Sequence, residues 1–438
     1  MKTFRIFPVF ILLISIFFSK CDTTEPPPPQ EKPKVIFLKL ITVSCTEAFI
    51  TVTANDTLLP VNITLYKDNA ALFNFTLTTT DTTITDTTLQ PNKIYTYQAK
   101  AEINSKTLKS DTLQVQTLDT TSHNFTWQTF TFGDPEAGSS ELYDIAIIDE
   151  NNIYAVGEIY MLDYLGQPDP LLYNIAHWNG IEWNIERVTI NFRGNNITPS
   201  LKGIFAFSAS QIWLTGGLVI FGNGTDWIPY DVRQITGYDS LSFTKCWGSN
   251  STNMYFSGLN GSLTHYDGQN WQKIESGSIA DIRDIWGTIE PISEFLKILA
   301  TASAINNYKI LTLTASSSKD TLEWQANKSL SGIWLDGIRT FTSGIDIWKN
   351  EKNNWQQLTS TGYFFTRVRG SNYNNIYGIG PDGIVHFNGS SWKIVNETPG
   401  DITLIAGDCS NNMVAAVGFT SSGGLVGKAA IMMGTLNK

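Results

Sequence analysis

The chain has little of what catalytic and metal sites are built from. Its 438 residues include four histidines and four cysteines. The cysteines, Cys21, Cys45, Cys246 and Cys409, follow neither the spacing of a zinc site nor that of a disulfide framework. Cys246 falls where equivalent segments have Ile or Val, so we interpret it as a small core residue, with a Cys246–Cys409 disulfide as the alternative. We expect no metal and no cofactor.

Charge of either sign is also scarce. Charged residues make up 16% of the chain, and the formal net charge is −10. Nucleic-acid binding needs clustered Lys and Arg side chains that displace counterions, and no such cluster occurs beyond the first few residues. We therefore expect no nucleic-acid partner. The apolar fraction of 42% is enough for a sizeable core, and the length predicts two or three domains.

The first twenty residues have the features of an export signal. A short basic segment precedes an apolar run, 9–18, that is too short to span a membrane. The stretch FFSKC (17–21) resembles a bacterial lipoprotein signal, although Lys20 replaces the usual small residue. The resemblance implies that Cys21 is lipidated and anchors the protein in the bacterial cell envelope, at the outer membrane or cell surface. Ordinary secretion with an incidental cysteine is the alternative.

Two segments follow the signal. Residues 21–34 are rich in proline and predict a coreless tether. Residues 35–119 alternate short β-rich runs with turns, at the spacing of a β-sandwich. The stretch LQPNKIYTY (89–97) resembles the L-x-P-x-x-x-Y stretch of fibronectin type III domains, which implies that the Tyr95 hydroxyl bonds back to the main chain. The second-strand tryptophan of that family is absent, and we expect Phe49 in its place.

The remainder, 124–438, repeats one unit. The clearest copies are NNIYAVG…AHWNGIEW (151–183), TNMYFSGLNGSLTHYDGQNW (252–271) and NNIYGIGPDGIVHFNGSSW (374–392). Strand-like units that recur every 30–55 residues or so are typical of a β-propeller. The pattern resembles bacterial propeller repeats of the form VWG…DVWAVG…G-x-I-x-H-[FWY]-[DN]-G-x-x-W, and proteins with these repeats mostly have no assigned activity.

Alignment of the repeats predicts one inner strand per unit, at 142–149, 201–207, 243–249, 282–288, 330–336, 365–371 and 402–408. The last unit has no closing tryptophan, and Trp127 can supply it from the start of the domain. We therefore expect the first strand to complete the last blade and close the ring. The predicted fold is all-β, a fibronectin type III-like β-sandwich followed by a seven-bladed β-propeller. A six-bladed ring is the alternative, because the unit before Trp324 departs from the repeat.

Three of the histidines occupy one position of the repeat. His177, His265 and His386 each stand six residues before a tryptophan. Equivalent positions of different blades lie too far apart for the bonds of about 2.0–2.1 Å that a shared metal ion would need. We expect structural roles for them, with hydrogen bonds to the turn that follows.

The inner strands converge where a propeller has its central opening. The third residues of the aligned strands include Asp144, Lys245, Asp284 and Arg367, and Arg283 is adjacent to them. We take these five as candidate binding residues at the channel rim. A solvated rim of polar strand ends is the alternative interpretation.

No motif for a reaction stands out. A phosphate loop, a nucleophile elbow and a metal-binding cysteine pair are all missing. We therefore predict a monomeric, non-enzymatic binding or scaffold protein that recognises a glycan or a protein through a propeller face. The insertion 161–174, in the first repeat, is a further candidate contact surface. The alternative is a carbohydrate-active enzyme, a glycoside hydrolase or lyase, with paired carboxylates at the channel mouth.

Overall fold

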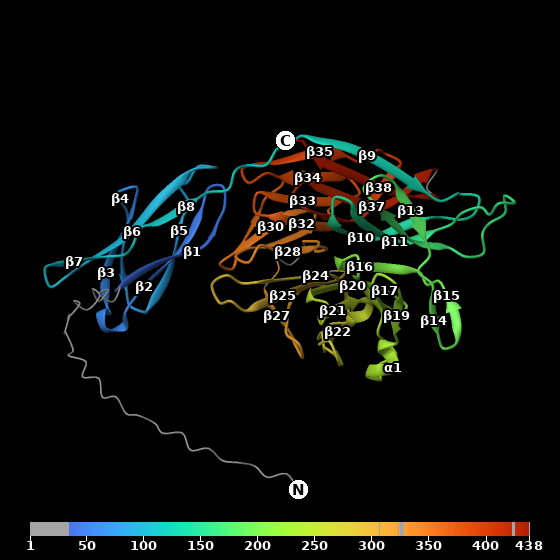
Figure 1. Ribbon diagram of the computed structural model, residues 1–438, viewed down its shortest axis with the longest axis horizontal. Helices are drawn as coiled ribbons and strands as arrows, with labels where there is room; N and C mark the ends of the chain where they lie inside the picture. The colour runs from blue at the N-terminus through green and yellow to red at the C-terminus, as the bar shows by residue number, and fades with distance from the viewer. Residues whose placement is uncertain (1–34, 306, 323, 325–327, 423–424, 438) are drawn as a thin grey trace, which may run out of the picture.

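The computed structural model describes residues 35–437, apart from 306, 323, 325–327 and 423–424. The predicted signal (1–20), Cys21 and the tether up to residue 34 lie outside the described residues. The described residues form two β-rich domains joined by a short linker (Figure 1). No helix among them is long and apolar enough to cross a membrane.

The first domain is a β-sandwich of two antiparallel sheets. One sheet has the order β1-β2-β5, and the other has the order β4-β3-β6-β7, with β8 also paired to β6. The bounds of these strands are Ile36–Val43 (β1), Ala48–Ala54 (β2), Val61–Lys67 (β3), Ala70–Leu77 (β4), Asp81–Asp86 (β5), Ile94–Ile103 (β6), Lys106–Lys109 (β7) and Leu113–Gln116 (β8), with a single 3-10 turn at Asp56–Leu58.

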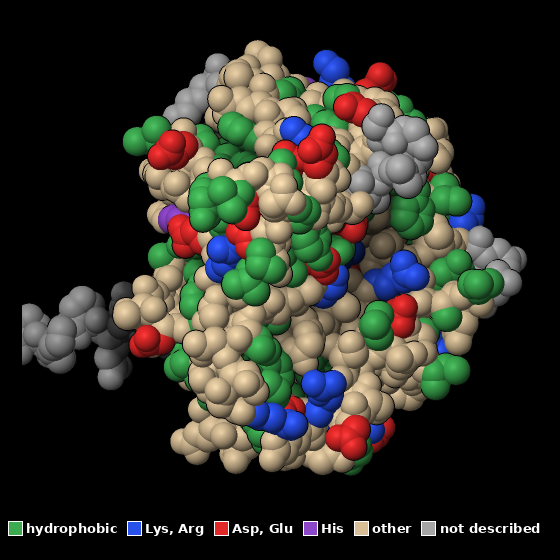
Figure 2. All heavy atoms as spheres, turned by 90° about the vertical axis from the view of Figure 1, so that its right-hand side faces the viewer, with side chains coloured by type: hydrophobic (Ala, Val, Ile, Leu, Met, Phe, Trp, Pro, Cys, Tyr) green, Lys and Arg blue, Asp and Glu red, His purple; other side chains and the backbone are tan. Residues whose placement is uncertain are grey.

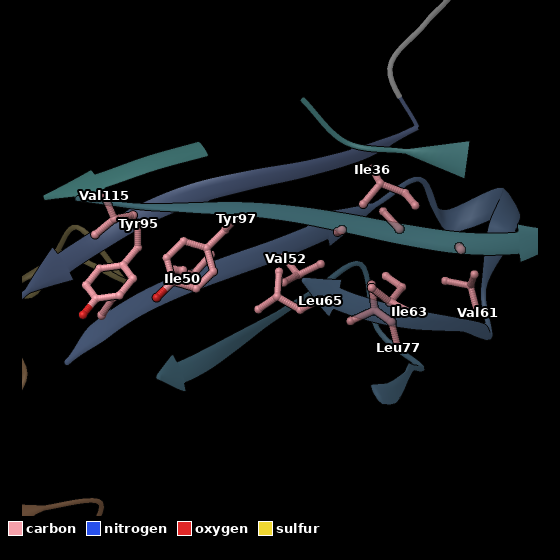
Figure 3. Close-up of a cluster of buried hydrophobic side chains, with 14 of the residues drawn as sticks. Ile36, Ile50, Val52, Val61, Ile63, Leu65, Leu77, Tyr95, Tyr97 and Val115 are labelled. Atoms are coloured by element: carbon pink, nitrogen blue, oxygen red, sulfur yellow. The ribbon is translucent and has the colours of Figure 1, made fainter. Parts of the chain in front are cut away.

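The sandwich core follows from alternation along the strands. Successive side chains of a strand point to opposite faces, so Ile50 and Val52 of β2 are buried against the facing sheet (Figure 3). Phe49 therefore points away from this core, and the expectation that it replaces the missing tryptophan is wrong. The Tyr95 hydroxyl accepts a hydrogen bond from the Gln90 amide at 2.9 Å, the link that the L-x-P-x-x-x-Y stretch implied.

The second domain is a ring of sheets. Its described residues form seven four-stranded antiparallel sheets, and each innermost strand contacts the innermost strand of the next sheet, with the last returning to the first. The innermost strands are β10 (Glu141–Asp149), β16 (Leu201–Ser208), β20 (Phe243–Asn250), β24 (Asp281–Ile289), β28 (Ile333–Leu335), β32 (Arg367–Asn372) and β36 (Ile402–Cys409). Each lies at one of the seven predicted positions.

The other strands follow outward in chain order. The second strands are β11 (Asn152–Ile159), β17 (Gln211–Gly216), β21 (Asn253–Gly258), β25 (Leu296–Ala304), β29 (Thr340–Gly344), β33 (Asn375–Gly380) and β37 (Met413–Ser422). The third are β12 (Tyr173–Trp178), β18 (Val219–Gly222), β22 (Leu263–Tyr266), β26 (Asn307–Leu313), β30 (Asp346–Glu351), β34 (Gly383–Phe387) and β38 (Leu425–Leu436). The outermost are β13 (Trp183–Glu186), β19 (Trp227–Tyr230), β23 (Trp271–Lys273), β27 (Ser318–Leu322), β31 (Asn354–Gln357), β35 (Trp392–Glu397) and β9 (Phe125–Phe132).

The ring closes with its own first strand. β9 pairs with β38 over eight residues, from Phe125 opposite Leu436 to Phe132 opposite Ala429. Trp127 lies over Gly434, where an added Cβ would come within 2.7 Å of the indole ring. This pairing gives the last sheet its fourth strand and ties the two ends of the domain together, as the position of Trp127 predicted.

Two details of the repeat differ from sheet to sheet. In the fourth sheet β27 ends before Trp324, because a tight turn at 314–317 starts that strand early. Each of the other six outermost strands contains its tryptophan. In some blades the tryptophan of the inner strand packs on a glycine of the next blade. Trp334 covers Gly370 in this way, and a Cβ on that glycine would lie 2.7 Å from the ring.

The sandwich packs against one face of the ring. Its contacts are with loops that join first to second strands and with the turn between the third and fourth strands at Asn388 and Gly389. The Lys39 ammonium lies 3.3 Å from the Glu294 carboxylate, and Asn374 Nδ2 donates to the Asp119 carbonyl at 2.8 Å. The other face of the ring therefore points away from the sandwich (Figure 1).

Arg339 is the central residue of this junction. Its guanidinium bonds to Asp336 at 2.9 Å and to Glu351 at 3.3 Å within the propeller, and to Glu47 of the sandwich. It also lies 3.8 Å from the centre of the Tyr373 ring. Phe49, which the sandwich core leaves out, lies on this side, 5.2 Å from the same guanidinium.

Candidate functional site: the channel mouth

The predicted column of residues lies inside the ring. Asp144, Lys245, Asp284 and Arg367 are all buried, because each is an inward position of an innermost strand. Arg283 is exposed and lines the cavity above them. The structure thus brings four of the candidates together in the channel and places the fifth at its mouth.

Lys245 and Asp144 form the first ion pair of the channel. The Lys245 ammonium lies 2.5 Å from Asp144 Oδ1. Burial, and then the charge of Arg367, lower the pKa of Lys245 to about 8, although Asp144 opposes this shift. The second oxygen of Asp144 accepts the amide hydrogen of Ile204, on the next blade, at 3.1 Å. Asp144 therefore joins two blades in addition to pairing with the lysine.

Asp284 forms the second ion pair, with Arg369. Two guanidinium nitrogens of Arg369 donate to the two Asp284 oxygens at 2.8 Å each, and the Ile333 amide donates to Oδ2 at 2.9 Å. Burial alone would raise the pKa of Asp284, but Arg369 and Arg367 outweigh it and hold that pKa at about 2. The carboxylate is therefore ionised and fully engaged.

Arg367 has no comparable partner. Its NH1 donates to the Thr366 carbonyl at 2.8 Å, while its Nε is buried without a hydrogen-bond acceptor among the described residues. The nearest carboxylate oxygen, on Asp284, lies 4.0 Å from that Nε and is already bonded to Arg369. Burial accordingly lowers the pKa of the Arg367 guanidinium.

The deeper channel contains charged residues outside the predicted set of five. Arg369 is two residues beyond Arg367 on the same strand, and Asp408 accepts the amide hydrogen of Ile147 at 2.9 Å. Burial raises the pKa of Asp408. Phe205 and Trp286 approach one another beneath them, with ring centres 6.4 Å apart. Applying the two-residue alternation further along each inner strand would have identified the deeper positions.

Above these pairs lies a cavity of about 320 Å³. It opens where the innermost strands begin, and its wall consists of Tyr143, Lys202, Thr244, Lys245, Leu259, Asp281, Ile282, Arg283, Ser331, Thr366, Arg367 and Ile405. The sandwich contacts loops at the other ends of these strands, so the mouth faces away from it. Figure 2 views this side of the ring and shows Lys and Arg side chains around a hollow.

The insertion at 161–174 belongs to the same face. It follows β11, whose last residues pair with the first residues of β10: Glu158 lies opposite Glu141. Its tip is ordered by Asp163, which accepts the amide hydrogens of Leu165 and Gln167 at 2.8 and 2.9 Å. Tyr164 is 93% exposed. The insertion therefore presents apolar side chains on the face that contains the mouth.

The repeat histidines have packing roles. His265 and His386 bond to Asn253 and Asn375 at 2.7 and 3.0 Å, residues that begin a second strand and not the turn we expected. His177 stacks on a tyrosine ring at 4.2 Å. Within the described residues, no three His, Cys, Asp or Glu side chains are grouped so that they could hold a metal ion.

The three cysteines of the described domains are free. Cys246 and Cys409 form no disulfide, so that alternative is wrong. Cys246 packs with Trp213, Phe243 and Phe256, as expected of a small core residue.

The comparisons with known proteins identify the fold. No protein-family model matches this chain, and none of the curated proteins matches it. Among solved structures, the chain is similar to YCF48 bound to a D1 peptide, at 13% identity over 71% of this chain and 95% of that one, with a TM-score of 0.51. A likeness to BBS1N in complex with ARL6DN has 10% identity over 66% of this chain and 88% of that one, with a TM-score of 0.43, too distant to carry an argument. The chain has the β-propeller fold.

Proposed function

We propose that this protein is a lipid-anchored binding protein of the bacterial cell envelope. In this proposal a fibronectin type III-type sandwich is the spacer, and a seven-bladed propeller recognises a protein or a glycan at its channel mouth. The observation that carries the proposal is the cavity of about 320 Å³ above a buried, incompletely paired arginine, Arg367. Concave sites with a few convergent polar groups are where ligands bind.

The position of the sandwich supports this orientation. The tether leads into the sandwich, and the sandwich occupies the propeller face opposite the mouth. A membrane anchor at Cys21 would therefore leave the mouth directed away from the attachment point. YCF48, a propeller of similar fold, is bound to a D1 peptide, which is in keeping with a peptide or protein ligand here.

Glycoside hydrolysis has less support. That reaction requires one carboxylic acid that is protonated at working pH, with a raised pKa. Asp284 has a pKa of about 2 and is bonded to Arg369, and Asp144 pairs with Lys245. Both carboxylates also tie neighbouring blades together through backbone amides. Asp144 and Asp284 thus have the environment of structural ion pairs, whereas Asp408, whose pKa burial raises, accepts the Ile147 amide hydrogen.

The test is to block the mouth. The full chain in detergent would be applied to a glycan array and a random-peptide library, beside a Thr244→Trp variant that fills the cavity and a matched Thr225→Trp variant on an exposed outer turn. We expect ligands that bind the parent and the Thr225→Trp protein but not Thr244→Trp. Ligands that bind the Thr244→Trp protein as tightly as the parent would refute the proposal. Release of reducing ends from a bound glycan would show that the protein is an enzyme instead.

Anchoring is tested separately. Replacement of Cys21 by Ala should release the protein from the membrane fraction, because the lipid would have no attachment site. Membrane retention of the Cys21→Ala protein would contradict the lipoprotein assignment while leaving the mouth proposal untouched.

A further inference from the structure

The mouth has more positive than negative charge. Lys202, Lys245, Arg283 and Arg367 line the cavity, with Asp281 as its one acidic residue. Two of these cations are neutralised by carboxylates outside the cavity wall: Lys202 by Glu158 at 2.9 Å, and Lys245 by Asp144. Arg283 has no ion pair with any described residue, and Arg367 has only the 4.0 Å approach to Asp284. A surplus of positive charge therefore remains for a ligand.

The surplus is built into the channel wall. Arg367 is 8% exposed, and a buried cation is costly unless it is paired and hydrogen-bonded. Its NH1 donates to the Thr366 carbonyl, and its Nε is buried without an acceptor, while the side chain also lines the cavity. Asp284 does not supply one, because its nearest oxygen lies 4.0 Å from that Nε, beyond hydrogen-bonding distance. The arginine is thus held in place for an acceptor from outside the chain.

The number and shape of the free donors favour a carboxylate. One edge of a guanidinium presents two parallel N–H groups, which match the two oxygens of a carboxylate. The Lys245 ammonium lines the same cavity and adds a second positive charge.

The walls favour a peptide over a sugar. Sugar rings commonly pack on exposed aromatic faces, and Tyr143 is the only aromatic residue among those that line the cavity. Its ring is covered by the Lys202 ammonium at 3.5 Å from the ring centre. The remaining apolar wall is aliphatic, from Leu259, Ile282 and Ile405, which suits an aliphatic side chain.

We propose that the mouth captures a carboxylate of a peptide segment, with Arg367 and Lys245 as its ligands and an apolar neighbour of the carboxylate against Leu259. This inference rests on the proposed binding function and names its ligand class. The carboxylate has two sources, a chain terminus or an Asp or Glu side chain, and the chemistry of capture is the same for both.

The experiment uses the full chain in detergent and an array of random octapeptides. The array has matched arms: free or amidated carboxyl termini, and sequences with Asp and Glu or with Asn and Gln in their place. Phosphopeptides and an oligosaccharide of uronic acids complete it. We expect binding only from arms that keep a carboxylate, and comparison of the terminal and side-chain arms identifies its source.

Variants locate the capture. Arg367→Gln should weaken binding roughly 10- to 100-fold, the loss of a charge-assisted hydrogen bond. The control is Arg193→Gln, an exposed arginine on the mouth face that pairs with Asp231 at 2.7 Å, which should change binding by less than about 2-fold. Arg367→Lys keeps the positive charge but removes the paired N–H donors of the guanidinium, so it should also weaken binding. This variant tests the proposal even if the Arg367→Gln protein does not fold.

The outcomes separate this inference from the proposed function. Peptides without a carboxylate that bind the parent as tightly, and lose binding in Thr244→Trp, would overturn carboxylate capture while the binding function stands. Binding by the uronic acids or phosphopeptides in the absence of binding by carboxylate peptides would overturn it too. If no ligand is sensitive to Thr244→Trp, the proposed function itself fails.

Discussion

Two buried arginines, one on each side of the propeller, have opposite surroundings. Arg339, at the junction with the sandwich, is 2% exposed and bonds to three carboxylates. Arg367, below the mouth, is 8% exposed and has no carboxylate within hydrogen-bonding distance. Burial lowers the pKa of both guanidinium groups, but Asp336 and its neighbours outweigh this effect at Arg339 and raise that pKa overall, whereas the pKa of Arg367 stays lowered.

The difference distinguishes a structural charge from one available to a ligand. A buried cation whose hydrogen bonds are all made within the chain stabilises one arrangement of its neighbours. A buried cation with a free donor is tolerated at a cost in folding free energy, which an incoming anion can offset. We therefore interpret the junction face as the structural side of the propeller, and we propose the mouth as its binding side.

The largest effect should come from Arg339→Ala. Removing this arginine leaves Glu47, Asp336 and Glu351 close together without their cation, which should cost about 3–5 kcal/mol of unfolding free energy. Calorimetry of the full chain would show a lower melting temperature. Glu47→Gln is the milder control, because Arg339 keeps two of its carboxylates. A melting temperature unchanged by Arg339→Ala would remove the contrast between the two faces.

Acid should weaken the junction face through His386. Burial, and then His123 at 3.0 Å, lower the pKa of His386 to about 3, whereas the unfolded chain takes up this proton near pH 6.5. Because the unfolded state binds more protons between these values, stability should fall by about 2 kcal/mol between pH 7 and 5. Chemical unfolding measures this slope. His386→Gln should flatten it, and an equal slope in both proteins would contradict the assignment.

Raising the pH above 7 should stabilise the protein through Lys245 at the mouth. The pKa of Lys245 is about 8 in the folded protein and near 10.4 in an unfolded chain. The unfolded state therefore holds more protons in this window, and stability should rise by about 2 kcal/mol between pH 7 and 9.5. Lys245→Met should lack that rise. Carboxylate peptides should bind less tightly over the same range, since Lys245 loses its charge.

The smallest effect on stability should come from Arg367→Met. This change removes the cation with the poorest pairing and leaves the Lys245–Asp144 and Arg369–Asp284 pairs intact. Unfolding free energy should change by less than about 1 kcal/mol, and stabilisation is within the expected range. A loss as large as that of Arg339→Ala would show that Arg367 is structural, and the two faces would then be alike.

The sequence predicted most of the propeller because the repeat carries the information. Most units contain their own alternation, turn and tryptophan, and the last unit lacks only the tryptophan, so the inner strands and the closing role of Trp127 follow from alignment alone. Phe49 could not be placed this way. Its outward direction depends on the register of β2 in the sandwich and on a partner, Arg339, almost three hundred residues away in the chain, as the Arg339–Glu47 contact makes plain.

The candidate site was predicted in position more than in pairing. Asp144, Lys245, Asp284 and Arg367 point into the channel because side chains alternate along each inner strand. The alignment of the repeats predicted all four, as the third residues of their strands. Which arginine neutralises Asp284 depends on how far along the channel each side chain extends. Arg369, one step deeper, reaches both carboxylate oxygens, and this leaves Arg367 the free edge that no pattern of residue types could indicate.

The closure of the ring has a consequence for biogenesis. β9 is the first propeller strand to be synthesised, and its partner β38 is the last, so almost the whole domain must be made before the two can meet. The sandwich is complete far earlier, and its contacts are local by comparison. During synthesis the sandwich can fold while β9, a strand rich in aromatic residues, is still without its partner. For that interval the chain exposes an edge that a chaperone, or the β9 of another copy, could occupy.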